Sequence, residues 1–130
     1  MSNIIKTYFD AFNAKDIQAM LACLSDDVEH HVNEGDVRIG KTAFADFCAH
    51  MNRCYDETLV NMVIFDAPDH GRAAAEYVVN GRYLQTDAGL PEAHGQRYTL
   101  PAGSFFDVSD GLITRVTTRY NLNDWIKQVS

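Results

Sequence analysis

The spacing of the hydrophobic residues changes from helical to strand-like near the middle of this chain. Up to about residue 55, apolar side chains recur three to four positions apart, as on one face of a helix. After residue 58, runs rich in branched and aromatic residues are separated by turn-forming segments. Helices followed by strands, rather than alternating with them, predict an α+β fold. In such a fold an antiparallel sheet is covered by helices on one face.

Three helices and one short strand are expected in the first half. Asp16 is a plausible N-cap for the second helix, and an alternating strand is expected at 28–32. The apolar stripes of the three helices are, in order, Ile4, Ile5, Tyr8, Phe9 and Phe12; Ile17, Met20, Leu21 and Leu24; and Phe44, Phe47, Cys48, Met51 and Tyr55.

The second half predicts four strands and a terminal helical turn. The strands are expected at 58–65, 72–86, 96–108 and 112–121, and the helical turn at 122–129. Pro101 lies inside the third of these strands, which implies a sheet edge or a bulge there. No linker or repeat divides the chain, so residues 1–130 are expected to form a single domain.

Charge and composition limit the partners. The formal net charge is −7, so a nucleic-acid backbone or an anionic membrane surface would repel the chain on average. We recognise neither a leader peptide nor a run of roughly 20 apolar residues, which a membrane span would need. The three cysteines form no CxxC pair, which is typical of reduced thiols. We therefore expect a cytoplasmic protein whose partner is a small molecule or another protein.

Three segments together resemble one known superfamily. "TYFDAFNAKDIQAMLACLSDDV", "GKTAFADF" and "GSFFDVSDGLITRV" are similar, in that order, to segments of nuclear transport factor 2-like proteins. Within that superfamily the chain resembles the ketosteroid isomerase and SnoaL-like polyketide cyclase branch. The resemblance implies a cone, also called cystatin-like, in which a curved, mostly antiparallel sheet wraps three N-terminal helices around an apolar pocket. It also implies a homodimer formed through the open face of the sheet.

The resemblance transfers some catalytic positions and not others. Ketosteroid isomerase removes a proton with an Asp base, and a Tyr and a protonated Asp stabilise the oxyanion. Tyr8 matches the oxyanion tyrosine in spacing, although a core role is the stronger expectation for an aromatic residue in the middle of this apolar stripe. His31 is our placement for the base, with His30 as the alternative, because adjacent strand residues point to opposite faces. The second oxyanion acid of the isomerase falls at Gly103, so the isomerase triad is incomplete, and a carboxylate position of cyclase relatives falls at Asn121.

The expected site is therefore a pocket containing one histidine. We expect His31 inside it and His30 facing away, with activity falling as the pH drops through the histidine pKa. The other possibility is that one ring is solvated and the second is a hydrogen-bonded core residue. The expected pocket residues, besides Tyr8, are Phe12, Phe47, Met51, Gly103, Phe105, Val116, Tyr120 and Asn121.

No cofactor or metal is expected. There is no P-loop or GxGxxG motif. His50 and Cys54 lie four residues apart on the third expected helix, but two ligands do not make a zinc site. The expected function is a cofactor-independent acid–base isomerase or cyclase acting on a small apolar carbonyl compound. The alternatives are a non-catalytic module that binds a ligand or a protein, and an epoxide hydrolase-like enzyme.

A homodimer would need an exposed sheet face. We expect Tyr77, Val79 and Tyr83, or their neighbours, to provide it. Glu76, Asn80 and Arg82 alternate along the same strand and are expected on a wet or interfacial face.

Overall fold

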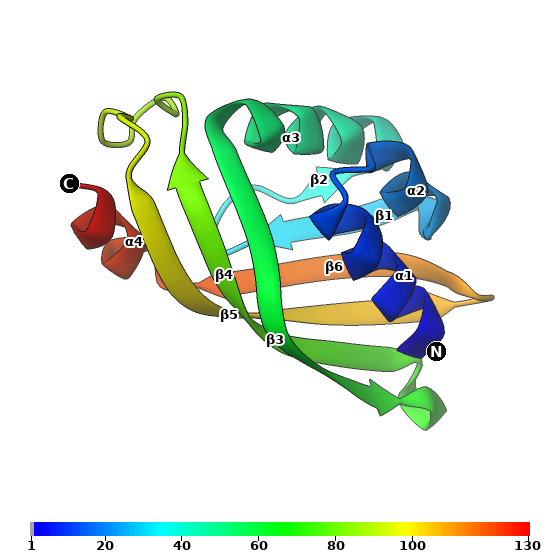
Figure 1. Cartoon of the computed structure of the whole chain (residues 1–130). Coiled ribbons are helices and arrows are strands. Elements are labelled where there is room, and N and C mark those ends of the chain that lie inside the picture. The colour runs from blue at the N-terminus through cyan, green and yellow to red at the C-terminus, as the bar shows by residue number, and fades with distance from the viewer. Residues whose placement is uncertain (1) are drawn as a thin grey trace.

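The computed structural model describes residues 2–130, which form one sheet and four α-helices (Figure 1). The helices are α1 (Ser2–Asn13), α2 (Ile17–Ala22), α3 (Lys41–Cys54) and α4 (Leu122–Val129). The strands are β1 (Leu24–Val32), β2 (Arg38–Ile39), β3 (Tyr55–Ala67), β4 (Arg72–Tyr83), β5 (Arg97–Ser109) and β6 (Leu112–Tyr120), and a single 3-10 turn, η1 (Pro68–His70), joins β3 to β4.

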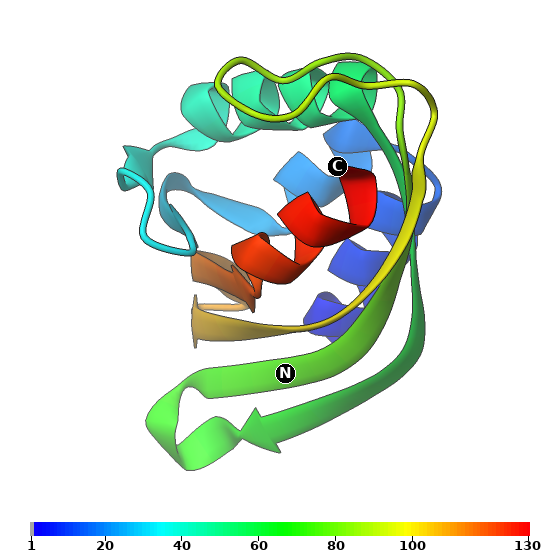
Figure 2. The same cartoon turned by 90° about the vertical axis from the view of Figure 1, so that its left-hand side faces the viewer.

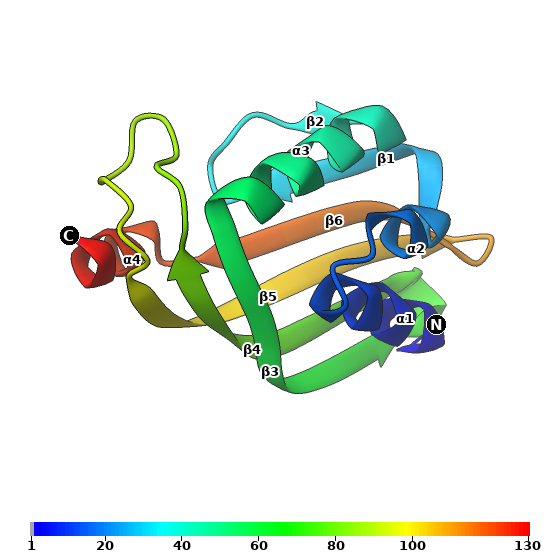
Figure 3. The same ribbon diagram turned by 45° about the horizontal axis from the view of Figure 1, so that its top comes forward.

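The sheet is strongly curved and mostly antiparallel. Its strand order is β2-β1-β6-β5-β4-β3, and only the β1–β6 pair is parallel. Viewed from the end, the sheet wraps around the helices, and α4 lies across the open end of the cone (Figure 2). Helices α1, α2 and α3 all lie over the concave face (Figure 3). This arrangement confirms the predicted α+β cone.

The helix ends differ slightly from those expected. The Asp16 side chain caps α2 as predicted, accepting a hydrogen bond from the Ala19 backbone N–H at 3.0 Å. The second helix ends at Ala22 and Cys23 caps it. Leu24, which was expected on this helix, is instead the first residue of β1. Tyr55 has extended backbone dihedrals and begins β3. In residues 2–130 no helix is long and apolar enough to cross a membrane.

Pro101 occupies a local edge, as its sequence position predicted. β5 lies between β4 and β6, but its pairing with β6 begins only at Ala102, opposite Tyr120. On the N-terminal side of Ala102, the edge of β5 that has no strand partner is covered by α4. The Gln128 side chain donates to the Thr99 carbonyl at 2.9 Å and accepts from the Thr99 N–H at 2.9 Å. The amide therefore satisfies the backbone groups that a strand would otherwise pair.

The β4 residues that were expected on the exposed face of the sheet lie on the covered face. Tyr77, Val79 and Tyr83 are all buried on the concave face, so they do not form the exposed surface that we predicted for them. Strand alternation places their neighbours, including Glu76 and Asn80, on the convex face. The concave face of β4 packs into a continuous core whose largest fully buried residues include Tyr83, Phe44 and Phe106.

Candidate functional site

The candidate site is a cavity of about 350 Å³ between the concave face of the sheet and helices α1 and α3. Phe44, Phe47 and Met51 line it from α3, and residues of α1, α2, all six strands, the loop after β4 and α4 complete its wall. Most of the lining is apolar or aromatic. A volume of this size falls within the range of small-molecule sites. The few polar side chains on its wall therefore decide what it can do.

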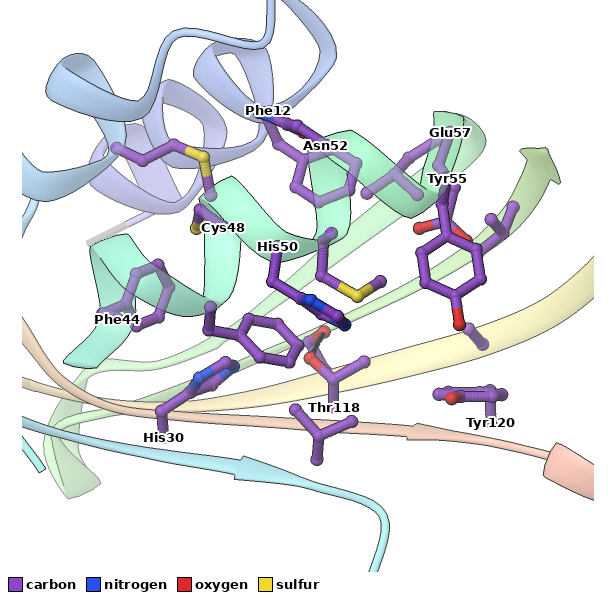
Figure 4. A pocket seen from close by; sticks show the side chains of 18 of the residues that line it. Phe12, His30, Phe44, Cys48, His50, Asn52, Tyr55, Glu57, Thr118 and Tyr120 are labelled. Atoms are coloured by element: carbon purple, nitrogen blue, oxygen red, sulfur yellow. Dashed lines mark hydrogen bonds between the residues drawn. The ribbon is translucent and has the colours of Figure 1, made fainter. Parts of the chain in front are cut away.

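Of the adjacent pair His30 and His31, His30 faces this cavity. Its ring packs against Phe44 and Phe47, with centroid distances of 4.5 and 4.7 Å, and only 4% of the residue is exposed. Figure 4 shows the ring rising from β1 toward α3. Burial, assisted by the nearby charges of Arg38 and His31, lowers the pKa of His30 from 6.5 to about 4. The imidazole is therefore neutral at neutral pH. Its buried Nδ1 atom has no hydrogen-bond partner within residues 2–130.

His31 points to the opposite face, so the predicted orientation of the pair was wrong. It lines a shallow groove on the convex side of the sheet, together with Phe65, Phe105 and Arg115. The cause is strand alternation: Val28 is fully buried on the concave face, and His30, two residues further on, shares its direction.

Tyr8 lies in the cavity wall on α1. Its ring packs edge-to-face against Phe44 at 6.3 Å and Phe106 at 5.8 Å, and the residue is 6% exposed. Phe44 therefore lies between the Tyr8 and His30 side chains and contacts both rings. Burial raises the pKa of Tyr8 well above its ordinary value, with smaller contributions from neighbouring thiols and Tyr77. The phenol is therefore a hydrogen-bond donor at any working pH.

A second polar group was missed by the sequence analysis. His50 on α3 and Tyr55 on β3 both reach Asp87 in the loop after β4. The His50 Nε2 atom is 2.9 Å from one Asp87 carboxylate oxygen, and the Tyr55 hydroxyl donates to the other at 2.7 Å. All three line the cavity, and His50 points from α3 into the space beside Thr118 (Figure 4).

A half-buried acid, Glu57, lies in the same wall. The Tyr98 hydroxyl donates to the Glu57 carboxylate at 2.6 Å. Burial raises the pKa of Glu57, partly opposed by this hydrogen bond and by the charge of Lys15. The Tyr98 ring can lie against β4 only because Gly81 has no side chain, since a Cβ there would come within 2.2 Å of the ring.

A chain of hydroxyl groups crosses the concave face of the sheet. The Tyr77 hydroxyl and the Ser104 hydroxyl are 2.7 Å apart, and Ser104 is 3.1 Å from the Thr118 hydroxyl. These three residues line the cavity and satisfy one another. The unpartnered Nδ1 of His30 differs from them in this respect.

The remaining predicted pocket residues fall into two groups. Phe12, Phe47, Met51 and Tyr120 line the cavity. Phe105 and Gly103 lie on the convex face and were wrongly placed, because Ser104 and Phe106 take the concave positions of β5. Two others also lie outside the cavity lining: Val116, 1% exposed, packs into the core, and the Asn121 side chain caps α4 by accepting from the Asp124 N–H.

The expectation that no metal binds was based on finding only two possible ligands. His50 and Cys54 lacked a third partner in the sequence, and the structure provides Asp87. One potential ligand atom from each of these residues lies within 4.8 Å of the others. The three cysteines are unpaired and buried, so the Cys54 thiol is free.

Comparison with known proteins identifies the family. Two solved structures, each described as a "putative polyketide cyclase", superpose closely. One, from Silicibacter sp. TM1040, is 70% identical, with a TM-score of 0.97, covering 99% of this chain and 94% of its own. The other, from Pseudomonas putida KT2440, is 52% identical, with a TM-score of 0.95, covering 98% and 96%.

More distant comparisons agree on the fold. A nuclear transport factor 2-like protein from Burkholderia pseudomallei K96243 is only 14% identical but has a TM-score of 0.84, covering 99% of this chain and 96% of its own. Among curated proteins, none has a significantly similar sequence. The model of the SnoaL-like domain matches residues 5–116, which confirms the resemblance seen in the sequence. The chain is therefore a member of the SnoaL-like domain family, within the nuclear transport factor 2-like superfamily.

Proposed function

We propose that this protein is a cofactor-independent acid–base catalyst that isomerises or cyclises a small, mainly apolar carbonyl compound inside the cavity. His30 is the base and Tyr8 donates a hydrogen bond to the carbonyl oxygen. The observation that carries this proposal is the neutral, buried His30 ring, whose Nδ1 has no partner within the described residues. Buried polar atoms are nearly always paired, so an unpaired one on a cavity wall indicates a group kept for a ligand.

The proposed reaction begins with removal of a proton from the carbon beside a carbonyl. The proton moves to a ring nitrogen of His30, and the electron pair of the broken C–H bond forms an enolate. Reprotonation at another carbon completes an isomerisation. Attack of the enolate carbon on a second carbonyl of the same molecule forms a ring, and that oxygen then takes the proton. Both outcomes return His30 to its neutral form and need no redox partner.

The lowered pKa of His30 is compatible with this role. Ketosteroid isomerase uses an Asp base with a pKa of about 4.6 for the same kind of proton abstraction. His30, with a pKa of about 4, is unprotonated at neutral pH and returns a captured proton readily. Because the Tyr8 phenol stays protonated, it can stabilise the negative charge that develops on the oxygen.

The cavity and the relatives both support the substrate class. Aromatic side chains such as Phe44 and Phe47 provide flat apolar walls for a ring system. The name "polyketide cyclase" given to the Silicibacter and Pseudomonas relatives denotes ring closure of a polycarbonyl compound, which requires the same enolate chemistry. The lining therefore fits a compact, ring-forming carbonyl compound.

Deuterium exchange tests the proposal without knowledge of the natural substrate. Small bicyclic ketones such as 2-tetralone would be incubated with the protein in D₂O, and loss of the α-proton signal would be followed by NMR. We expect catalysed exchange above the buffer rate, because enolate formation alone is sufficient. Binding of such ketones without any catalysed exchange would favour the non-catalytic module and overturn the catalytic proposal.

We also propose a homodimer formed through the convex face of the sheet. Val63, Phe65 and Phe105 are 50%, 53% and 48% exposed there, and the helices α1–α3 cover only the other face. Exposed apolar side chains that gather on one face commonly mark an interface, and the partner proposed here is a second copy of the chain.

Replacing Phe65 and Phe105 together with aspartate should convert the dimer to a monomer, because each copy would bring charges into an apolar contact. Sedimentation at micromolar concentration would measure the change. Val37, which is 47% exposed in the loop before β2, provides a matched control, and Val37→Asp should leave the dimer intact. A wild-type protein that sediments as a monomer would refute the proposal.

A further inference from the structure

We propose that His50, Cys54 and Asp87 form a site for a zinc ion on the wall of the cavity. The site is separate from His30 and Tyr8, and it stands whether or not those residues are catalytic. The carrying observation is that a ring nitrogen, a thiol and a carboxylate oxygen lie within 4.8 Å of one another. The three come from two different elements, α3 and the loop that follows β4.

Helix geometry brings the first two ligands together. His50 and Cys54 are four residues apart in the last turns of α3, so their side chains lie on the same face of the helix. Both belong to a rigid element whose backbone is already fixed by helical hydrogen bonds. Binding an ion would therefore cost little conformational entropy at these two ligands.

The third ligand is held in place by hydrogen bonds that an ion would leave intact. The Asp87 backbone N–H donates to the Tyr83 hydroxyl at 2.9 Å, and that hydroxyl donates to the Pro91 carbonyl at 2.7 Å. Tyr55 donates to the carboxylate oxygen Oδ2, so Oδ1 is the oxygen directed toward His50. An orienting hydrogen bond to a ligating carboxylate is a common feature of metal sites.

The present His50–Asp87 contact is consistent with an exchange of a proton for a metal ion. At 2.9 Å, one proton lies between the His50 Nε2 and the Asp87 Oδ1. A cation bound between the same two atoms would take the place of that proton, which moves to the Nδ1 atom of a neutral His50 ring or leaves to solvent from a protonated one. The Cys54 thiol, on the adjoining turn, would release its proton to solvent as its sulfur binds the ion. A small separation of the two side chains would suffice, because a zinc ion binds N and O ligands at about 2.0–2.2 Å.

The donor set selects the metal. One nitrogen, one sulfur and one oxygen suit a borderline ion such as zinc, whereas calcium and magnesium prefer oxygen alone. His50 and Asp87 line the cavity, while Cys54 does not. A fourth coordination position would therefore face the cavity, as in zinc sites that keep one place for water or a ligand.

Cobalt is the probe for this site, because Co²⁺ takes zinc positions and its bond to a thiolate absorbs strongly in the near ultraviolet. The full-length protein, stripped with a chelator, would be titrated with Co²⁺ and then with Zn²⁺. We expect a thiolate-to-cobalt band that saturates at one ion per chain and disappears when zinc replaces cobalt. Thermal unfolding should shift to higher temperature with added zinc, because the ion binds the folded chain.

Variants separate this site from adventitious binding. Cys54→Ser should abolish the thiolate band, and Asp87→Asn and His50→Ala should each weaken cobalt affinity by about tenfold or more. Cys48→Ser, which removes a buried thiol of the same helix outside the cluster, should keep the band. Asp87 lies in a loop, so Asp87→Asn remains informative even if the buried Cys54 variant folds poorly. The proposal is overturned if the wild-type protein gives no band or if Cys54→Ser retains it.

Discussion

Replacing His30 with glutamine should lower the rate of α-proton exchange by about 10²–10⁴-fold, the usual contribution of a positioned general base. Glutamine has a similar reach and can form a hydrogen bond, but its amide cannot accept the substrate proton. The rate is measured by NMR on the same ketones in D₂O. Ligand binding should change far less than the exchange rate, because the aromatic walls of the cavity, Phe44 and Phe47 among them, remain.

The adjacent histidine is a matched control. His31→Gln alters the same strand one residue away, but its side chain lies on the convex face. It should leave the exchange rate unchanged. Equal loss of activity in both variants would assign the effect to strand damage instead of proton transfer.

The pH profile provides an independent readout. The sequence suggested that activity would fall as the pH drops through an ordinary histidine pKa. Because burial lowers the pKa of His30 to about 4, the fall should instead occur near pH 4. A decline centred near pH 6.5 would indicate a solvated base and contradict the assignment of His30.

Local patterns in the sequence were sufficient for the fold class, and the family resemblance added the cone shape. Helical spacing around Phe9 and Phe47, the Asp16 cap and the position of Pro101 all depend on neighbours within a few residues. Each element therefore carried its own signal. Their order, with helices first and strands after, then left few topologies other than an antiparallel sheet with one covered face.

The predicted orientation of the site residues was wrong because the alignment to the relatives was shifted by one residue. The resemblance placed the base at His31, but alternation turns a shift of one position into the opposite face of the sheet. Val28 contained the missing signal, because a valine two residues before His30 shares its face and is fully buried. The same one-residue shift put Phe105 into the predicted pocket, whereas the concave face of β5 carries Ser104, which lines the cavity, and Phe106, which packs in the core against Tyr8.

The His50–Asp87–Tyr55 group had no local signal at all. Asp87 is 37 residues from His50 along the chain, and nothing in either segment refers to the other. One indirect sign existed: the connection between β4 and β5 spans residues 84–96, longer than most connections in compact domains. Such loops often carry function, and this one provides a side chain to the cavity wall.

The burial that keeps His30 neutral should also make the protein sensitive to acid. Its pKa is about 4 in the folded chain and 6.5 in the unfolded chain. Between these values the unfolded chain binds a proton that the folded chain does not. The free energy of unfolding contributed by His30 therefore decreases as the pH falls from 6.5 toward 4, and it changes no further below that.

The expected loss is roughly 3 kcal/mol, since one pKa unit corresponds to about 1.4 kcal/mol. Other groups add their own pH dependence. The pKa of Asp107 is lowered, first by its hydrogen bond from Arg115, so Asp107 also loses stabilisation in acid, whereas the raised pKa of Glu57 acts in the opposite direction. The contribution of His30 must therefore be taken as a difference between two proteins.

Urea unfolding of wild type and His30→Gln from pH 7.5 to pH 4 provides that difference. The variant cannot bind the extra proton at position 30, so it should lose less stability than the wild type, and the gap should widen only below pH 6.5. His31→Gln should follow the wild-type curve, because the His31 ring lies on the convex face. Parallel curves for wild type and His30→Gln would mean that residue 30 does not titrate differently on folding. If His30→Gln suppresses exchange and also raises the free energy of unfolding in acid, then the buried base lowers the stability of the wild-type protein in acid.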